Sequence, residues 1–247
     1  MTRKTFYFLL FTFCFLPLSL FSQKVEVLER GEATNLKKQT IIEYLYEEPE
    51  EDNRIFFVAT LKASGFEDVA QLFDAVRFEA GRMGANCFRL EEYVPDENNS
   101  SLTLRTYFAL QDYLSENDQL KERNVIYVFG NDKSDDGNIS FKINGKKTKV
   151  KSREYFRYEN GIGERAKISK GGFMGASVAI DGAENKPATY LTVSGFGLAP
   201  AGGYVEGHIG SVAYSGFGVG ISIATGKINY ISPNLANLLL LIWKESE

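Results

Sequence analysis

The sequence predicts an α+β protein, with an N-terminal strand-helix-strand-strand unit followed by a Gly-rich antiparallel β-sandwich-like domain. Three observations support this prediction. The first half contains one clearly amphipathic helix among strand-like runs. From residue 125 the hydrophobic pattern changes to the period of two that is typical of strands. Fourteen of the 23 glycines then lie between Gly171 and Gly226, which indicates strands that approach one another closely.

Residues 1–22 have the three parts of a secretory signal peptide. Arg3 and Lys4 give a basic start, an apolar run follows from Phe6 to Leu20, and Ser22 is a small residue before the expected cleavage point. The run is shorter than the roughly 20 residues of a membrane-spanning helix, so an uncleaved anchor is the less favoured alternative. The Phe-rich core and the Ser-Gln ending resemble export signals of Bacteroidota-type bacteria. This resemblance implies a secreted protein of the periplasm or cell envelope.

Few residues with reactive side chains remain after cleavage. Cys14 lies inside the signal, so Cys87 is the single cysteine of the mature chain, and His208 is the single histidine. The strand-like surroundings of Cys87 predict a buried, inert thiol, with an intermolecular disulfide as the alternative. The residue types on which most metal sites and most cysteine or serine hydrolases depend are therefore nearly absent. We therefore expect no metal, no cofactor and no catalytic residue, although enzymatic activity is left open.

The charges divide the mature chain into blocks. Residues 23–124 carry 12 Lys/Arg and 21 Asp/Glu, which is a net charge of −9, whereas residues 125–170 carry 11 and 6, which is a net charge of +5. This contrast predicts an acidic α+β domain over residues 23–124 and a β-rich domain over residues 125–232. Residues 233–247 form a hydrophobic C-terminal tail.

One amphipathic helix is predicted in the acidic domain. A capping box of Ser64 with Glu67 is expected to begin it, and Gly84 is expected to end it in the left-handed conformation. Its apolar residues recur every three or four positions and form one stripe, namely Val69, Leu72, Phe73, Val76, Ala80 and Met83.

Strands are predicted before and after this helix, over residues 54–61, 86–93 and 101–110. A helix with one apolar face must pack on one side of the sheet that these strands form. The order of elements resembles the small strand-helix-strand modules of bacterial envelope proteins of unknown or stress-related role. The resemblance is one of topology over residues 54–110.

The β-rich domain begins with a strand over residues 125–129. A hairpin follows over residues 141–150, because Asn144-Gly145 supplies the positive φ angles of a type I′ turn. The run IYVFG…FKINGKKTKVKSREYF resembles small envelope β-sandwich domains over about 45 residues. This resemblance implies a binding or spacer module rather than an enzyme.

The basic hairpin is the predicted binding surface. Its four cations occur at every second residue and are expected to share one strand face, and two aromatic residues follow them. Such a strip can hold an anionic glycan, an envelope surface or a protein partner, while nucleic acid is not expected after export. The alternative is a solubilising edge strand that lysines protect from self-pairing. The predicted binding residues are Lys147, Lys149, Lys151, Arg153, Tyr155 and Tyr158.

Two features support an alternative function as a peripheral, membrane-associated β protein. Residues 216–224 alternate large apolar side chains with Gly, Ser and Ala, as a lipid-facing strand does. Residues 234–244 are strongly hydrophobic and end in Trp243-Lys244. We expect this tail to dock into the core, with an interfacial anchor or a partner-binding segment as alternatives.

Three further patterns are weaker. His208 is the basis of a second alternative function, a hydrolase, which would need a nucleophile or carboxylate beside it. Residues 161–166 fit a loose G-x-G-x-x-A pattern, but they open no helix and are not expected to bind a dinucleotide. The acidic residues between 43 and 52 lack the ligand order of a calcium loop and are expected to form a solvated linker.

Overall fold

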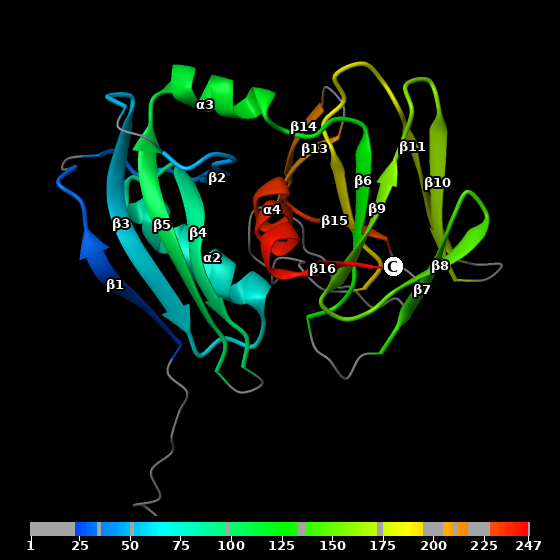
Figure 1. Ribbon diagram of the computed structural model, residues 1–247, viewed down its shortest axis with the longest axis horizontal. Helices are drawn as coiled ribbons and strands as arrows, with labels where there is room; N and C mark the ends of the chain where they lie inside the picture. The colour runs from blue at the N-terminus through cyan, green and yellow to red at the C-terminus, as the bar shows by residue number, and fades with distance from the viewer. Residues whose placement is uncertain are drawn as a thin grey trace, which may run out of the picture.

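The computed structural model describes residues 23–33, 36–49, 52–96, 99–132, 137–171, 175–194, 205–209, 212–216 and 228–246. Within these ranges the chain is mostly β-structure, with three helices and mixed sheets, which agrees with the predicted α+β class. The two halves lie side by side, with the C-terminal helix between them (Figure 1). The predicted signal peptide and residues 217–224 lie outside the described ranges.

The first half is a five-stranded sheet in the order β1-β3-β5-β4-β2. Helix α2 (Val69–Met83) packs against β3 and β5 on one face, and α3 (Gln111–Gln119) lies across one end of the sheet (Figure 1). The strand-helix-strand-strand order predicted for residues 54–110 is confirmed. The strands are β1 (Lys24–Arg30), β2 (Glu43–Tyr44), β3 (Ile55–Ser64), β4 (Cys87–Val94) and β5 (Ser101–Ala109).

The two ends of α2 differ in how well the sequence predicts them. Gly84 ends the helix with φ 95°, as expected, because only glycine adopts this left-handed conformation at low cost. The capping box is wrong: β3 continues through Ser64, and Asp68 is the N-cap, with its carboxylate accepting from the Gln71 N–H at 2.8 Å. A cap must directly precede the first helical turn.

The second half contains a five-stranded sheet, in the order β15-β12-β6-β9-β16, and a four-stranded sheet, in the order β11-β10-β7-β8. A purely antiparallel arrangement was expected, but β12 pairs with β6 and β16 pairs with β9 in parallel. A short hairpin of β13 and β14 completes the described strands. Their bounds are β6 (Val125–Phe129), β7 (Ile139–Ile143), β8 (Lys146–Val150), β9 (Glu154–Glu159), β10 (Arg165–Lys170), β11 (Ala176–Asp181), β12 (Thr189–Thr192), β13 (Val205–Ile209), β14 (Val212–Gly216), β15 (Asn229–Tyr230) and β16 (Lys244–Glu245).

A hydrophobic core joins the two sheets of the second half. Ile126 and Val128 of β6 are buried in one cluster with Phe141 of β7 and Ile168 of β10. The β7–β8 hairpin that closes this core turns at Asn144-Gly145, whose φ angles are 49° and 83°. The predicted type I′ turn is therefore confirmed.

Helix α4 (Pro233–Ile242) connects the halves. It contacts β2 of the first half and β12 of the second, and Leu238 and Leu239 are fully buried. They belong to one apolar cluster that includes Phe88 from the first half and Phe129 from the second. The expectation that the hydrophobic tail docks into the core is confirmed, and the two halves share that core.

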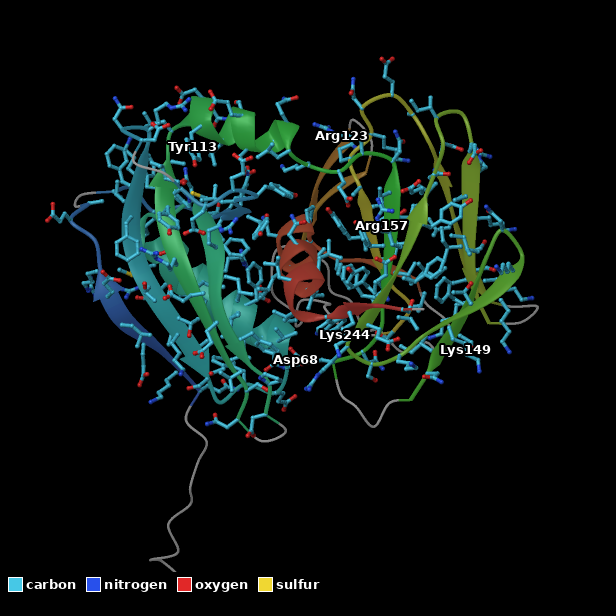
Figure 2. The ribbon with its side chains drawn as sticks, in the orientation of Figure 1. Asp68, Tyr113, Arg123, Lys149, Arg157 and Lys244 are labelled. Atoms are coloured by element: carbon cyan, nitrogen blue, oxygen red, sulfur yellow. The ribbon has the colours of Figure 1, made fainter. Side chains whose placement is uncertain are left out.

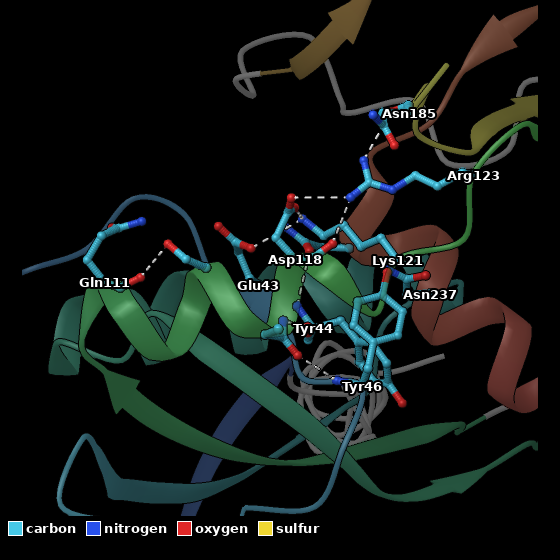
Figure 3. A network of polar contacts seen from close by, with 12 residues as sticks. Glu43, Tyr44, Tyr46, Gln111, Asp118, Lys121, Arg123, Asn185 and Asn237 are labelled. Atoms are coloured by element: carbon cyan, nitrogen blue, oxygen red, sulfur yellow. Dashed lines mark hydrogen bonds and ion pairs between the residues drawn. The ribbon is translucent and has the colours of Figure 1, made fainter. Parts of the chain in front are cut away.

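A polar network reinforces the same junction (Figure 3). The Asn237 side chain donates to Tyr46 Oη at 2.9 Å and accepts from Tyr190 Oη at 3.4 Å. The Asn117 side chain of α3 donates to the Tyr44 carbonyl at 2.9 Å. Because Tyr44, Asn117, Tyr190 and Asn237 are buried and Tyr46 is half-buried, each bond replaces one that the group would otherwise make with water.

The buried tyrosines of this network should make the protein sensitive to alkali. Burial raises the pKa of both Tyr46 and Tyr190 above the ordinary value. In the unfolded chain tyrosine ionises near pH ~10, so their stabilisation is complete below that pH and is lost as the pH rises above it. We expect the free energy of unfolding, measured in urea, to fall between about pH 9 and pH 11. The fall should be shallower in Tyr46→Phe, and equal slopes would contradict the prediction.

Candidate functional site

The four-stranded sheet has one face on the core and one face in solvent. Lys142 of β7 lies between the buried Phe141 and Ile143, and Lys167 of β10 lies between the buried Ala166 and Ile168. Because successive side chains of a strand point to opposite faces, both lysines are on the solvent side. Lys147 and Lys149 of β8 share this side and are exposed. We call Lys142, Lys147, Lys149 and Lys167 the lysine face.

The strand register defines how the lysine face is arranged. Lys147 lies directly opposite Lys142, and Lys149 lies opposite Ser140. On the other side of β7, Ser169 of β10 is opposite Lys142. Hydroxyl groups therefore alternate with ammonium groups on neighbouring strands. Lys149 lies at the end of the molecule away from Asp68 and the first half (Figure 2).

The described part of the chain does not neutralise the charges of the lysine face. Among the described residues, none of the four ammonium groups has a carboxylate within 4.0 Å. The acidic residue on the same side of the sheet, Asp181, is already held by Arg165, whose Nη2 donates to it at 3.0 Å. This surface therefore keeps a positive field that can attract an anion.

The direct opposition of Lys142 and Lys147 should cost stability, because like charges facing each other across two strands repel. We expect Lys142→Gln to raise the free energy of unfolding by about 0.2–1 kcal/mol at low salt, and the gain should shrink in high salt, which screens exposed charges. Urea unfolding at two salt concentrations measures this. Lys38→Gln, at an exposed lysine of the first half, is the control, and a loss of stability in Lys142→Gln would contradict the prediction.

A hollow of about 460 Å³ lies on the lysine face. Lys170, at its border, donates from Nζ to the Val193 carbonyl, and burial lowers the pKa of this amine. The hollow offers ammonium donors together with hydroxyl groups that can both donate and accept. It is lined by Ser140, Phe141, Lys142, Lys147, Ser169, Lys170 and Gly171.

The four cations predicted from the sequence do not share one strand face. Lys147 and Lys149 do, but β8 ends at Val150 and the chain turns before β9. Lys151 forms an ion pair with Glu154 at 3.4 Å. Arg153 has φ 56° in this turn, and its Nε donates to Asp132 Oδ1 at 3.0 Å at the junction with the first half. The period of two was extended past the end of the strand, which is why the prediction failed here.

The two predicted aromatic residues are also separated from the lysine face. Tyr155 and Tyr158 belong to β9 of the other sheet and, three residues apart, point to opposite faces. The Tyr155 ring packs 5.7 Å from that of Tyr127, in the core shared with the first half. Tyr158 packs against the core between the two sheets, and its hydroxyl accepts from Asn144 Nδ2 at 3.0 Å. Tyr155 and Tyr158 therefore do not add aromatic stacking to the lysine face, contrary to the prediction from the sequence.

Two members of the lysine face were not predicted, Lys142 and Lys167. Each has a local signal, because each stands between apolar residues at the period of two. What joins them to Lys147 and Lys149 is the pairing of β7 with both β8 and β10. Residues that far apart in the chain come together through register, which local patterns do not specify.

A second hollow, of about 340 Å³, has internally matched charges. Arg157 is one of the residues that line it, and its guanidinium lies 3.3 Å from Glu122 and 2.8 Å from Glu159. Burial, followed by the hydrogen bond to Glu122, raises the pKa of Tyr127 beside them. Arg123 also lines the hollow and pairs with Asp118 at 3.7 Å, so with both arginines paired to carboxylates this hollow offers little attraction to a charged ligand.

Of the remaining candidates, Cys87 and residues 161–166 give no second site, and His208 is described only by its backbone. Cys87 is fully buried, and burial raises the pKa of its thiol, as expected for an inert cysteine. Residues 161–164 form a turn that leads into β10, so no helix follows the G-x-G pattern. The backbone of His208 lies in β13 opposite Ala213, and its side chain is outside the description. The hydrolase and membrane alternatives stay predictions.

The described residues contain neither a group of metal ligands nor a helix that could span a membrane, and the comparisons with known proteins found no match. Among the described residues, no three His, Cys, Asp or Glu side chains are grouped so that they could hold a metal ion. No helix in the described part of the chain has an apolar stretch long enough to cross a bilayer. No protein-family model, curated protein or solved structure matches this chain.

Proposed function

We propose that this is an exported, non-catalytic protein of the periplasm or cell envelope that binds an anionic polymer through the lysine face. The observation that carries the proposal is the group of four lysines on one solvent-facing side of a sheet, none of which has a carboxylate partner among the described residues. The signal-like residues 1–22 support export. We propose also that the two sheets of the second half act as a β-sandwich-like binding module.

The strength of such binding follows from the number of charges. A single exposed ion pair contributes about 0.2–1 kcal/mol, so one lysine would hold a ligand poorly. Four engaged together would contribute about 0.8–4 kcal/mol, which is roughly fourfold to 1000-fold in affinity. Because the groups are exposed, salt should weaken this binding strongly.

The test compares two variants on dextran sulfate. In the first, the lysine face is neutralised by changing Lys142, Lys147, Lys149 and Lys167 to Gln. In the control, four exposed lysines elsewhere, Lys37, Lys38, Lys151 and Lys244, are changed to Gln, so that the net charge falls equally. We expect the first variant to lose affinity by about tenfold or more and the control by less than about threefold.

Two outcomes would contradict the proposal. One is equal loss in both variants, which would mean that net charge alone governs binding. The other is retention of the natural protein that does not change with salt. Circular dichroism of both variants checks that the exchanges leave the fold intact.

A further inference from the structure

The four lysines form a line rather than a cluster. On β8, Lys149 is opposite Ser140 of β7, and Lys147 is opposite Lys142 of β7. On β10, Lys167 is opposite Asn144, which follows β7. Successive members are therefore separated by about 7 Å along β8, about 5 Å across to β7, and about 7–8 Å diagonally to β10. Together they cross the sheet as a diagonal row that advances about 13 Å along β7.

This row suits a linear ligand with repeated charges better than a compact anion. A small anion such as phosphate would be held by several donors that converge on one point. Here Lys149 and Lys167 are two strands and four register positions apart, so a single small anion cannot reach both. A chain with a negative charge every few ångströms can meet all four.

The groups beside the lysines indicate what else the ligand carries. The hollow lies along this row, at Lys142 and Lys147, and its other polar side chains include Ser140 and Ser169. Serine hydroxyls donate and accept hydrogen bonds, which suits the hydroxyl groups of a sugar. The volume of about 460 Å³ falls within the range of small-molecule sites.

Two kinds of exposed side chain that other anionic ligands would need are missing from the four strands of this sheet, namely large apolar residues and aromatic rings. None of the large exposed apolar residues of the described chain lies on β7, β8, β10 or β11, so these strands offer no apolar side chain for insertion into a bilayer. No aromatic ring is exposed on these strands either, whereas single-stranded nucleic acids are held by stacking on such rings.

We infer that the ligand is an acidic polysaccharide that runs diagonally across β8, β7 and β10, with its carboxylates or sulfates on the lysines and one of its sugars in the hollow beside Ser140 and Ser169. This inference rests on the proposed function and specifies its ligand class. It assigns charge recognition to the lysines and recognition of sugar hydroxyls to the serines.

Ligands of different length test whether the four lysines bind one polymer chain together. Oligogalacturonates, which carry a carboxylate on every sugar, are titrated against the full chain, with neutral dextran as the control. Affinity should rise steeply up to about four or five sugars and level off after that. An affinity that is the same for the dimer and the longest oligomer would overturn the row.

The double variant Ser140→Ala/Ser169→Ala separates this inference from the proposed function. Because a hydrogen bond to a hydroxyl contributes modestly, we expect a loss of about threefold to tenfold for polygalacturonate. Affinity for polyphosphate, which has no sugar hydroxyls, should stay within about twofold. An unchanged affinity for polygalacturonate would overturn the role of the serines while leaving the proposed function standing.

A further arm uses vesicles of phosphatidylglycerol in the same buffer. Binding to them as tight as to polygalacturonate would overturn the polysaccharide in favour of a membrane surface. If polygalacturonate, polyphosphate, dextran sulfate and vesicles all fail to bind, the proposed function falls together with this inference.

Discussion

Replacing Leu238 by alanine should lower the free energy of unfolding by about 2–5 kcal/mol. The side chain is fully buried in the cluster that both halves share, and its helix contacts β2 on one side and β12 on the other. The substitution removes apolar contacts and leaves a cavity that neither half can close alone. Trp243 is the only tryptophan of the chain and directly follows α4, so its fluorescence reports unfolding around this helix.

Leu241→Ala is the matched control on the same helix. Its side chain is 49% exposed, so the loss should remain below about 1 kcal/mol. The shared core also predicts that far-ultraviolet circular dichroism and Trp243 fluorescence give one common transition in the natural protein. Similar losses for the two leucines, or two separate transitions, would contradict the central place of α4.

The sequence predicts the local elements well, because their signals lie within a few residues. The apolar stripe of α2, the stop at Gly84 and the Asn144-Gly145 turn each depend on nearby residues alone. The docking of the tail also followed from its composition, since an apolar segment left exposed would invite association. The surfaces onto which the tail docks could not be predicted in this way, because they depend on contacts between residues far apart in the chain.

The candidate site was only half predictable for the same reason. The alternation that correctly placed Lys147 and Lys149 was carried on to Lys151 and Arg153, where the strand has ended. Arg153 has a positive φ angle, which is uncommon for residues other than glycine, asparagine and aspartate, so the sequence gives no warning of it. Its burial partner, Asp132, lies 21 residues away, and only the fold brings the two together.

Asp132 should be the most sensitive charged residue of the junction. Its side chain is 7% exposed, with Oδ1 accepting from Arg153 Nε at 3.0 Å and Oδ2 accepting from the Val69 N–H at 2.9 Å. Val69 is the first residue of α2, where the helix dipole favours a negative charge. One carboxylate thus ties the β8–β9 turn of the second half to the start of the helix in the first.

Asp132→Ala should lower the free energy of unfolding by about 1–3 kcal/mol, because the buried Val69 N–H loses its acceptor and the partly exposed Arg153 loses its carboxylate. Asp68, beside it, provides a partial offset: burial and then the charge of Asp132 raise the pKa of Asp68, so the substitution relieves that repulsion. Asp112→Ala is the control, because Asp112 is 63% exposed and pairs with Arg54 at 3.8 Å. It should cost less than about 1 kcal/mol.

A double-mutant cycle with Arg153→Ala separates the ion pair from the loss of packing. If Arg153 depends on Asp132, the two substitutions together should cost less than the sum of their separate effects, by about 0.5–3 kcal/mol. Urea unfolding of the four proteins measures this difference. Strict additivity would show that Arg153 is stabilised by its turn alone, and would assign the effect of Asp132 to the start of α2.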